Sequence, residues 1–413
     1  MREYAMLRRR RGAGARAPFD MAPGPAAGAE IEPGEVWVER AYLTDSEVLD
    51  LAADPSVATV TPTMPTSLGA LPALSTSDAP SAWGIGAIRA DSSPFDGSSI
   101  AVAVLGTGID AEHAAFAGVQ LVQRDFTATG GGDGHGHGTH VAGILFGRDL
   151  DGVRIGVARG VTRALIGKTF SESGVGRSDW MQEAILWAYQ EGARVIALAM
   201  TLDLERAVAE FVAEGLPPHA ATLRALECYR ANARALDALI TLVRARSASE
   251  PGAIVVVAAG DDSRRDARPP AVAFRIAAGP PAAAADALVV GAVEQRTAGL
   301  ITAPFSNLYP RLCAPGVDVA SAQRGGGIAA RNGTSMAAAH VAGVAALWWQ
   351  HLGERSPAEL VAAHVLRSCR TGVFASAPHP AEAGAGLVTA PGEELLAPRA
   401  RTPASAIPDC RHR

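Results

Sequence analysis

NGTSMAAAHVAG, at Asn332–Gly343, is the stretch that decides how the rest of the chain is interpreted. A turn of small residues ends on Ser335, and small and apolar residues typical of a buried helix follow at once. A serine at the start of a helix lies beside free backbone N–H groups and the positive end of the helix dipole. That position suits a nucleophile whose intermediate is an oxyanion. The stretch alone is equally consistent with a core helix that begins Gly-Thr-Ser, so the other motifs must decide.

The composition is that of a globular protein. Hydrophobic residues make up 48% and charged residues 19% of the 413 residues, enough for a sizeable core and two or three domains. The net charge of −5 argues against nucleic acid or an anionic membrane as the main partner. The four cysteines form no CxxC pair, so we expect neither a disulfide framework nor a cysteine metal site.

The sequence also shows no pattern of a secretory signal or a membrane span. The basic run Arg8–Arg11 is followed by glycine and alanine, where a signal peptide needs an apolar core. The longest apolar run, Met336–Trp349, contains His340 and is too short to cross a bilayer. A soluble, cytoplasmic protein is therefore the default expectation.

Apolar segments alternate with helical patterns through the central part of the chain. Strands that are apolar throughout are covered on both faces, and their alternation with helices is typical of parallel sheets. The pattern predicts an α/β fold, with a doubly wound and mostly parallel sheet, over residues 83–375. The expected strands are Ile100–Leu105, Arg163–Lys168, Val195–Leu198, Ile254–Ala259 and Ala287–Val293.

Two segments of different composition precede this domain. Residues 1–33 are rich in Arg, Gly, Ala and Pro, and we expect them to be disordered. Residues 34–66 predict a small β-α-β unit, in which Thr44 and Glu47 form a capping box at the start of the helix. A unit of this size must dock on another surface to be stable.

The remaining segments are connections and additions. Residues 67–82 form a Pro/Ser/Thr-rich linker, and residues 376–413 form a C-terminal tail. Residues 203–249 interrupt the strand spacing with two helical patterns. A packed helical hairpin is the preferred interpretation of this insert, and a lid over the active site is the alternative.

DGHGHGTHVAG, at Asp133–Gly143, places His135, His137 and His140 within six positions. Three histidines so close together are one sign of a metal site. This run contains no cysteine, however, and its spacing matches neither a metal-binding helix nor a zinc finger. We therefore assign no metal ligands to it.

Taken together, HGTHVAG at His137–Gly143 and GTSMAA at Gly333–Ala338 resemble the histidine and serine signatures of the subtilisin-like serine peptidases. The resemblance implies that Ser335 is the nucleophile, that His137 is its general base, and that the substrate is a peptide or protein bound in extended form. It also makes residues 34–66 similar to an inhibitory prosegment. The helical insert resembles that of a bacterial branch of the family.

The charge-relay position departs from the family pattern. Family members carry an aspartate in Asp-Ser/Thr-Gly at the end of a buried strand, and this chain has Gly106 there. Without a carboxylate, the tautomer of His137 is not fixed and the imidazolium is not stabilised. Loss of this carboxylate alone lowers turnover in such enzymes by about 10⁴-fold. Asp110 or Asp133 could substitute for it if either approaches the histidine.

The oxyanion position departs as well. The family's asparagine after Ala-Ala-Gly is replaced by Asp261, and an ionised carboxylate repels the oxyanion that the asparagine would stabilise. A protonated Asp261 could donate a hydrogen bond, but His137 must be neutral at the same pH. Both conditions hold only if the pKa of Asp261 lies above that of His137. If Arg264 and Arg265 lie close to Asp261, they would lower its pKa and so make this condition harder to meet.

The resemblance also indicates where the backbone would hold an extended substrate. Ala199, Met200 and Thr201 replace the family's Ser-Leu-Gly, and Thr201 restricts the backbone where glycine is permissive. Ala258–Gly260 is the second expected substrate-binding segment.

Two hypotheses of function remain open: a strongly impaired serine endopeptidase, and a pseudoprotease that binds a peptide or partner protein without cutting it. A third interpretation, a dinucleotide fingerprint at Gly106–Ala111 with Asp125 as the ribose-binding acid, is weaker. We expect no cofactor. Calcium is left open, because Asp110 matches a calcium-ligand neighbourhood in some relatives but one carboxylate does not establish a site. Oligomeric state is left open.

Overall fold

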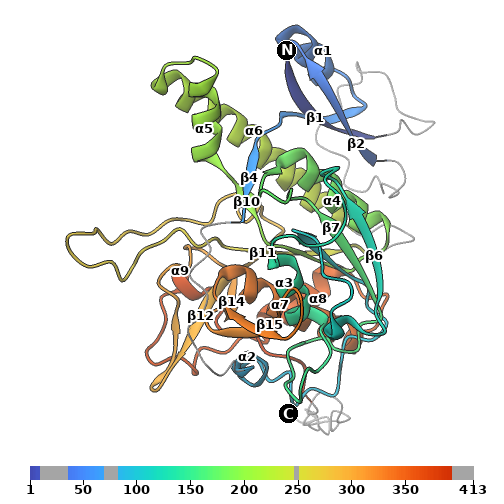
Figure 1. The fold of residues 1–413 in the computed structure, drawn as a ribbon, viewed down its shortest axis with the longest axis vertical. Coiled ribbons are helices and arrows are strands. Elements are labelled where there is room, and N and C mark those ends of the chain that lie inside the picture. The colour runs from blue at the N-terminus through green and yellow to red at the C-terminus, as the bar shows by residue number, and fades with distance from the viewer. Residues whose placement is uncertain (10–35, 69–81, 246–250, 393–413) are drawn as a thin grey trace, which may run out of the picture.

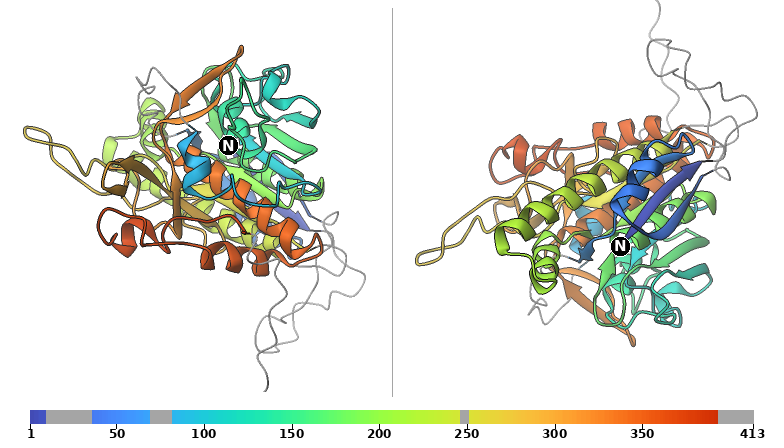
Figure 2. Two further views of the ribbon diagram at one scale, coloured as in Figure 1. Left: turned by 90° about the horizontal axis from the view of Figure 1, so that it is seen from below. Right: turned by 90° about the horizontal axis from the view of Figure 1, so that it is seen from above.

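The computed structural model of the chain describes residues 1–9, 36–68, 82–245 and 251–392 (Figures 1 and 2). Its centre is a sheet with the strand order β13-β12-β11-β9-β5-β7-β6, in which β14 also pairs with β12. The pairings are parallel except between β12 and β13, so the expected doubly wound, mostly parallel sheet is confirmed. The strands are β5 (Val102–Gly106), β6 (Gln120–Asp125), β7 (Arg163–Lys168), β9 (Val195–Leu198), β11 (Ile254–Ala258), β12 (Leu288–Arg296), β13 (Gly299–Thr302) and β14 (Leu312–Pro315).

Helices cover both faces of this sheet. Along β5, Val102 and Val104 pack in one core cluster, while Ala103 and Leu105 pack in another, as the alternation of side chains in a strand requires. Helices α3 and α7 lie in the first layer, and α4 and α6 lie in the second. The helices are α2 (Trp83–Ala87), α3 (His137–Phe146), α4 (Ser178–Gln190), α5 (Leu204–Ala213), α6 (Pro218–Arg244), α7 (Thr334–Leu352), α8 (Ala358–Arg367) and α9 (Pro380–Ala383), with a 3₁₀ helix at Ala114–Phe116.

The small N-terminal unit contains a strand that the sequence did not predict. Strand β1 (Arg2–Arg9) lies between β2 (Val36–Leu43) and β3 (Val57–Pro62) and pairs with both in antiparallel fashion. The expectation of disorder is therefore wrong for Arg2–Arg9, because the buried side chains of Tyr4–Leu7 supply the apolar centre of this sheet. Residues 10–33 lie outside the described residues.

The helix of this unit, α1 (Asp45–Ala52), begins with the predicted capping box. The Thr44 side chain accepts a hydrogen bond from the backbone of Glu47, and the Glu47 carboxylate accepts one from the backbone N–H of Thr44. After β3, strand β4 (Pro65–Ser67) inserts between β8 (Gly176–Arg177) and β10 (Thr201–Leu202) of the large domain, antiparallel to each. The N-terminal unit is thus joined to the large domain by strand pairing. Residues 69–81 of the expected linker lie outside the described part.

The described part of the expected insert, residues 203–245, contains the helix pair α5 and α6, which lies beside the N-terminal unit in Figure 1. Residues 246–249 lie outside the described residues. The amide of Asn232 on α6 is fully buried and donates a 2.8 Å hydrogen bond to the carbonyl of Pro62 at the end of β3. Arg2 pairs with Glu214 at 2.9 Å and stacks over the Phe211 ring. The insert therefore holds the N-terminal unit against the body.

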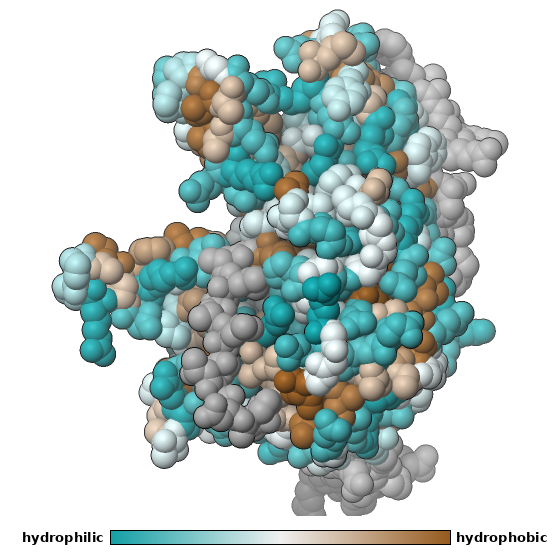
Figure 3. All heavy atoms as spheres, viewed as in Figure 1, coloured by the Kyte–Doolittle hydropathy of each residue, from teal (hydrophilic) through white to brown (hydrophobic). Residues whose placement is uncertain are grey.

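The segment after Asp261 leaves the body as a long arm, residues 262–279 (Figures 1 and 2). Val272, Phe274 and Ile276 are exposed on it, and apolar residues lie along its edge in Figure 3. At the C-terminus, Leu387 and Val388 are buried, so the chain packs on the body further than the expected tail boundary at 376. The strands β15 (Val319–Ala322) and β16 (Ile328–Arg331) form a separate hairpin before α7.

Candidate active site

Ser335 occupies the start of α7, a helix that is buried along most of its length. Gly333 precedes the helix with φ 142°, a backbone conformation that a side chain would strain, and the helix begins at Thr334. Every residue from Thr334 to Trp349 is buried, and Ser335 itself is 4% exposed. The apolar helix thus fixes the serine at a helix N-terminus, as the sequence predicted.

His137 begins the neighbouring helix, α3, after Gly136 with φ 83°. Helix α3 packs directly on α7 in the same layer. The guanidinium of Arg331, four residues before Ser335, lies 3.2 Å from where a side chain at Gly136 would begin. The structure therefore brings the histidine and serine segments together at the starts of two packed helices. Sequence reasoning missed Arg331.

The His137 ring is buried and without a hydrogen-bond partner. It is 1% exposed, and neither ring nitrogen has a partner among the described residues. Burial lowers the pKa of His137 to about 3, and the nearby His135 and Arg331 add to this effect, while Asp133 opposes it. The imidazole is therefore neutral at physiological pH, but nothing within the described ranges selects its tautomer.

Neither candidate substitute for the missing carboxylate reaches this ring. Asp133 Oδ1 accepts hydrogen bonds from the backbone of His135 and Gly136, at 3.1 and 2.7 Å. Its Oδ2 accepts from the backbone and hydroxyl of Thr139, at 2.8 and 2.7 Å. The Oδ2 atom of Asp110 accepts from the backbone of Gly325 at 2.8 Å. Asp133 thus secures the loop and first turn of α3, and Asp110 holds a different loop.

Gly106 ends β5 beside this first turn. The next residue, Thr107, accepts a 2.8 Å hydrogen bond through its hydroxyl from the backbone N–H of Gly138, so the strand end is fastened to α3. A side chain beginning at Gly106 would meet no atom of the described residues within 4 Å. The charge-relay position therefore has open space for a Cβ and holds no carboxylate.

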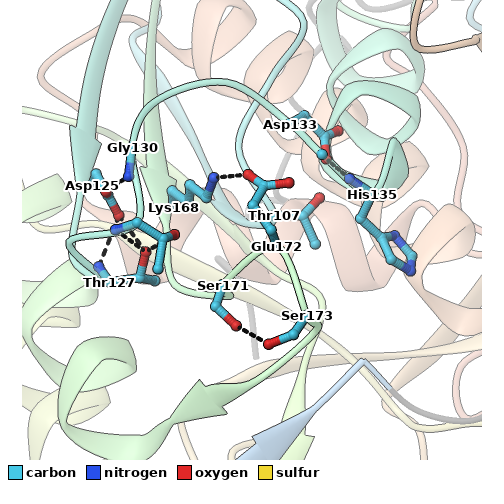
Figure 4. A network of polar contacts seen from close by, with 12 residues as sticks. Thr107, Asp125, Thr127, Gly130, Asp133, His135, Lys168, Ser171, Glu172 and Ser173 are labelled. Atoms are coloured by element: carbon cyan, nitrogen blue, oxygen red, sulfur yellow. Dashed lines mark hydrogen bonds and ion pairs between the residues drawn. The ribbon is translucent and has the colours of Figure 1, made fainter.

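Charged side chains lie on the next two strands across the sheet from β5, which are β7 and β6 (Figure 4). Lys168 is the register partner of Gly106 on β7; it is 3% exposed and forms an ion pair with Glu172. Beyond it, Asp125 accepts hydrogen bonds from the Thr127 hydroxyl at 2.6 Å and from the backbone of Gly130 at 2.9 Å. Lys168 ends β7 as expected, yet its proximity to the charge-relay position was not predicted.

Asp261 lies just beyond β11 and points at the start of α7. Its Oδ1 accepts a 2.9 Å hydrogen bond from the backbone N–H of Thr334. Burial raises the pKa of Asp261 to about 6, against the hydrogen bonds from Thr334 that lower it. Arg264 donates to backbone carbonyls and lowers this pKa only weakly, and Arg265 pairs with Glu382 at 2.9 Å. The two arginines therefore do not neutralise the Asp261 carboxylate.

The expected substrate-binding segments border the same site. Thr201 in β10 pairs with Ser67 of β4, while Ala199 and Met200 are buried just before it. Ala258 ends β11, Ala259 follows, and the backbone N–H of Gly260 donates a 3.1 Å hydrogen bond to the Thr334 hydroxyl. An extended segment of the chain itself, β4, thus already lies in the groove between β8 and β10.

The dinucleotide interpretation of Gly106–Ala111 finds no structural support. No helix begins directly after β5, as a dinucleotide fingerprint requires; instead, Gly108 packs against the carbonyl of Gly132. Within the described ranges, no group of three or more His, Cys, Asp or Glu side chains is placed to hold a metal ion. None of the described helices is long and apolar enough to span a membrane.

Comparison with known proteins agrees with this arrangement. A sequence model described as "Subtilase family" matches residues 97–386. Subtilisin DY of Bacillus licheniformis is 31% identical over 273 residues, covering 64% of this chain and 83% of that protein. The thermophilic serine proteinase of Bacillus sp. (strain AK1) is 30% identical over 253 residues, covering 60% and 51%. The major intracellular serine protease of Bacillus subtilis (strain 168) is 28% identical over 259 residues, covering 61% and 68%.

Proposed function

Because the chain belongs to the subtilase family of serine peptidases, we propose that it is a serine endopeptidase of low turnover, with Ser335 as nucleophile and His137 as general base. One observation carries the proposal. Ser335 and His137 begin two helices, α7 and α3, that pack together beside a groove in which β4 is held as an added strand. The packed helices support the proposed pair of nucleophile and base, and the added strand supports an extended substrate.

The reaction would follow from these positions. The Ser335 hydroxyl attacks a peptide carbonyl, and the His137 ring takes up the hydroxyl proton and returns it to the leaving amine. The oxyanion forms at the start of α7, where the helix dipole and free N–H groups stabilise negative charge. Water then hydrolyses the acyl-enzyme, and His137 acts as base again.

Turnover should be low because the histidine lacks support. Neither nitrogen of the His137 ring has a partner within the described part of the chain, so its orientation is not fixed for proton transfer. The imidazolium that forms in the transition state is also without a counter-ion. Asp261 adds a second restriction, because its ionised form opposes the oxyanion.

The two pKa values leave a range of pH in which both groups are in the required state. His137 is neutral above a pKa of about 3, and Asp261 is protonated below a pKa of about 6. Within this range a protonated Asp261 keeps its hydrogen bond from Thr334 and can donate its own proton towards an oxyanion. We therefore assign the peptidase an acidic optimum.

The substrate is a peptide or protein in extended conformation, paired between β8 and β10. Strand β4 occupies this position, and the unit before it is similar to an inhibitory prosegment. A substrate can pair with Thr201 only after Ser67 has left. The N-terminal unit is therefore proposed to inhibit the site until it is displaced.

A second candidate function is a pseudoprotease that holds an extended peptide without cutting it. Two observations favour this function. Gly106 supplies no carboxylate, and the His137 ring has no hydrogen-bond partner among the described residues. The groove itself does not depend on either residue.

Labelling with a fluorophosphonate, which reacts only with an activated serine, separates the two functions. The natural chain and a Ser335→Ala control are incubated with the probe from pH 4 to pH 8, and hydrolysis of denatured casein is followed in parallel. Slow labelling that disappears in Ser335→Ala is expected. No Ser335-dependent signal at any pH would exclude the peptidase and leave the peptide-binding function, which isothermal titration with an extended peptide would then test.

A further inference from the structure

We propose that the buried space at Gly106 binds a small carboxylate anion, of the size of formate, which takes the place of the missing charge-relay carboxylate and makes the peptidase anion-dependent. This inference rests on the proposed peptidase function, because it describes how the same histidine becomes competent. It requires a space of suitable size, an unpaired donor that faces it, a nearby positive charge and a route of entry.

The space is at the end of β5. Gly106 is buried, and a Cβ placed there would have no neighbour among the described atoms within 4 Å. Side chains alternate along a strand, so Gly106 faces the same layer as Val102 and Val104. That layer contains Val141 and Ile144 of α3, the helix that begins with His137. The free volume therefore opens towards the histidine helix.

The donor is the His137 ring. The Thr107 hydroxyl holds the backbone N–H of Gly138 at 2.8 Å, which places the strand end against the first turn of α3. The ring is 1% exposed, and neither of its nitrogens has a hydrogen-bond partner among the described residues. A buried polar group without a partner costs about 1–3 kcal/mol. A carboxylate that accepts the Nδ1 proton removes this cost and fixes the tautomer with Nε2 free to accept the serine proton.

Positive charge is available to retain an anion. Lys168 is the register partner of Gly106 on the neighbouring strand, and its side chain is buried and paired with Glu172. The guanidinium of Arg331 lies beside Gly136, the residue before His137. Its Nε atom is buried and has no hydrogen-bond partner among the described residues. The two cations offset part of the cost of burying an anion.

The nearby carboxylates cannot take this role in their present positions. Both carboxylate oxygens of Asp133 accept hydrogen bonds, one from the backbone of Gly136 and the other from the backbone of Thr139. Both oxygens of Asp125 also accept hydrogen bonds, from the backbone of Thr127 and of Gly130. Glu172 is different, because its side chain is 51% exposed and it forms the ion pair with Lys168. It is the internal competitor that an experiment must exclude.

Glu172 also marks a route of entry. It lines an open pocket of about 640 Å³, together with Asp110, Gln123 and the Gly131–Gly134 loop. An anion that enters this pocket and displaces Glu172 would reach Lys168, the register partner of Gly106. The anion binds reversibly and forms no covalent bond, so it changes the orientation and charge of His137 without entering the reaction.

The test titrates sodium formate into the full chain at about pH 5, against sodium chloride at equal ionic strength. Two signals are followed: the Nδ1–H resonance of His137 in histidine-¹⁵N-labelled protein, assigned with His137→Ala, and the rate of Ser335 labelling by a fluorophosphonate. We expect the resonance to shift until the formate site is saturated, and the labelling rate to rise at least about tenfold. This rise is part of the factor of about 10⁴ in turnover that the charge-relay carboxylate contributes in such enzymes.

Three variants locate the effect. Gly106→Leu fills the space and should abolish both responses, with its fold checked by circular dichroism and melting temperature. Gly106→Asp supplies the carboxylate and should label quickly without any further response to formate. Glu172→Gln should retain the formate response, because formate and not Glu172 supplies the carboxylate.

The outcomes separate the inference from the proposed function. Rapid labelling of Gly106→Asp with no response of the natural chain to formate refutes the anion site and leaves the peptidase intact. A formate response that persists in Gly106→Leu places the anion elsewhere and also refutes it. Labelling of the natural chain that is lost in Glu172→Gln assigns the carboxylate to Glu172 instead. If neither the natural chain nor Gly106→Asp is labelled, the peptidase function itself is wrong, and the resonance alone decides whether the anion binds.

Discussion

The carboxylate of Asp261 accepts a 2.9 Å hydrogen bond from the backbone N–H of Thr334, so a side chain at the end of β11 caps the helix that carries Ser335. The residue at the oxyanion position thus has two opposing effects. As a cap, an ionised Asp261 favours the positive end of α7. As a neighbour of the reacting carbonyl, it opposes the oxyanion unless it is protonated. The pH at which it loses its proton therefore links the stability of the site to its activity.

The first prediction concerns the pH profile of Ser335 reactivity. His137 is neutral above a pKa of about 3, and Asp261 is protonated below a pKa of about 6, so labelling should be fastest between these values. At pH 8, two units above the pKa of Asp261, the labelling rate should fall about 100-fold below its maximum. Asp261→Asn should remove this decline. A profile of the natural chain that rises towards pH 8 would contradict the role given to Asp261.

The second prediction concerns folding stability at the same residue. Burial raises the pKa of Asp261 from 3.8 to about 6, so the folded state disfavours the ionised form. Its contribution to stability is complete below pH 3.8 and is lost as the pH rises through 6, at a cost of about 3 kcal/mol for 2.2 pKa units. Asp261→Asn should therefore raise the free energy of unfolding by up to that amount at pH 8 and by little at pH 3.5.

Urea unfolding at the two pH values measures this difference. Asp266→Asn, an exposed position on the adjacent arm, is the matched control and should change little at either pH. Equal effects of Asp261→Asn at both pH values would show that the cost lies in packing and not in ionisation.

The third prediction concerns restoration of the family residues. Gly106→Asp has space for its side chain and places a carboxylate beside α3, so Ser335 labelling should rise about 10³- to 10⁴-fold. Asp261→Asn in addition should contribute about 10-fold at pH 7, one unit above the pKa of Asp261, and about 100-fold at pH 8. Gly106→Ala, which fits the same space without a charge, controls for backbone stiffening and should give no increase. If the natural chain matches the restored variant, its histidine already has a partner and low turnover is the wrong conclusion.

The sequence was sufficient for the central fold because its signals are local. The five apolar segments each became a strand of the sheet, and Ser335 and His137 lie at helix starts because Gly333 and Gly136 precede them. Strand β1 was missed because its pairing partners lie more than 25 residues away, across a segment whose composition suggested disorder for the whole N-terminus. The hydroxyl contact between Thr107 and Gly138 depends on how α3 packs against the end of β5, and the proximity of Lys168 to Gly106 depends on strand register. Register between distant segments leaves no trace in a single sequence.

Asp133 shows that sequence distance alone does not predict the role of a side chain at the site. Sequence distance from His137 made it a candidate for the missing carboxylate, but its oxygens are fully used by the loop and the first turn of α3. A short sequence separation from a catalytic base brought the side chain close without giving it a free oxygen. Asp133 is excluded as the charge-relay carboxylate because both of its oxygens already accept hydrogen bonds, although it lies close to His137 in sequence.

The last prediction concerns the hold of the helical insert on the N-terminal unit. Asn232 is fully buried, donates to the carbonyl of Pro62 at 2.8 Å, and accepts from Gln182 at 3.3 Å. Asn232→Leu leaves both partners unpaired and should weaken docking of the unit by about 1–3 kcal/mol. Removing the half-exposed pair of Arg2 and Glu214 by Arg2→Gln should cost under about 1 kcal/mol, because surface ion pairs contribute little. If β4 inhibits the groove, Ser335 should be labelled, and trypsin should cut after Arg40 of β2, more quickly in Asn232→Leu than in Arg2→Gln. Equal rates in the two variants would show that strand pairing at β4, and not the insert, retains the N-terminal unit.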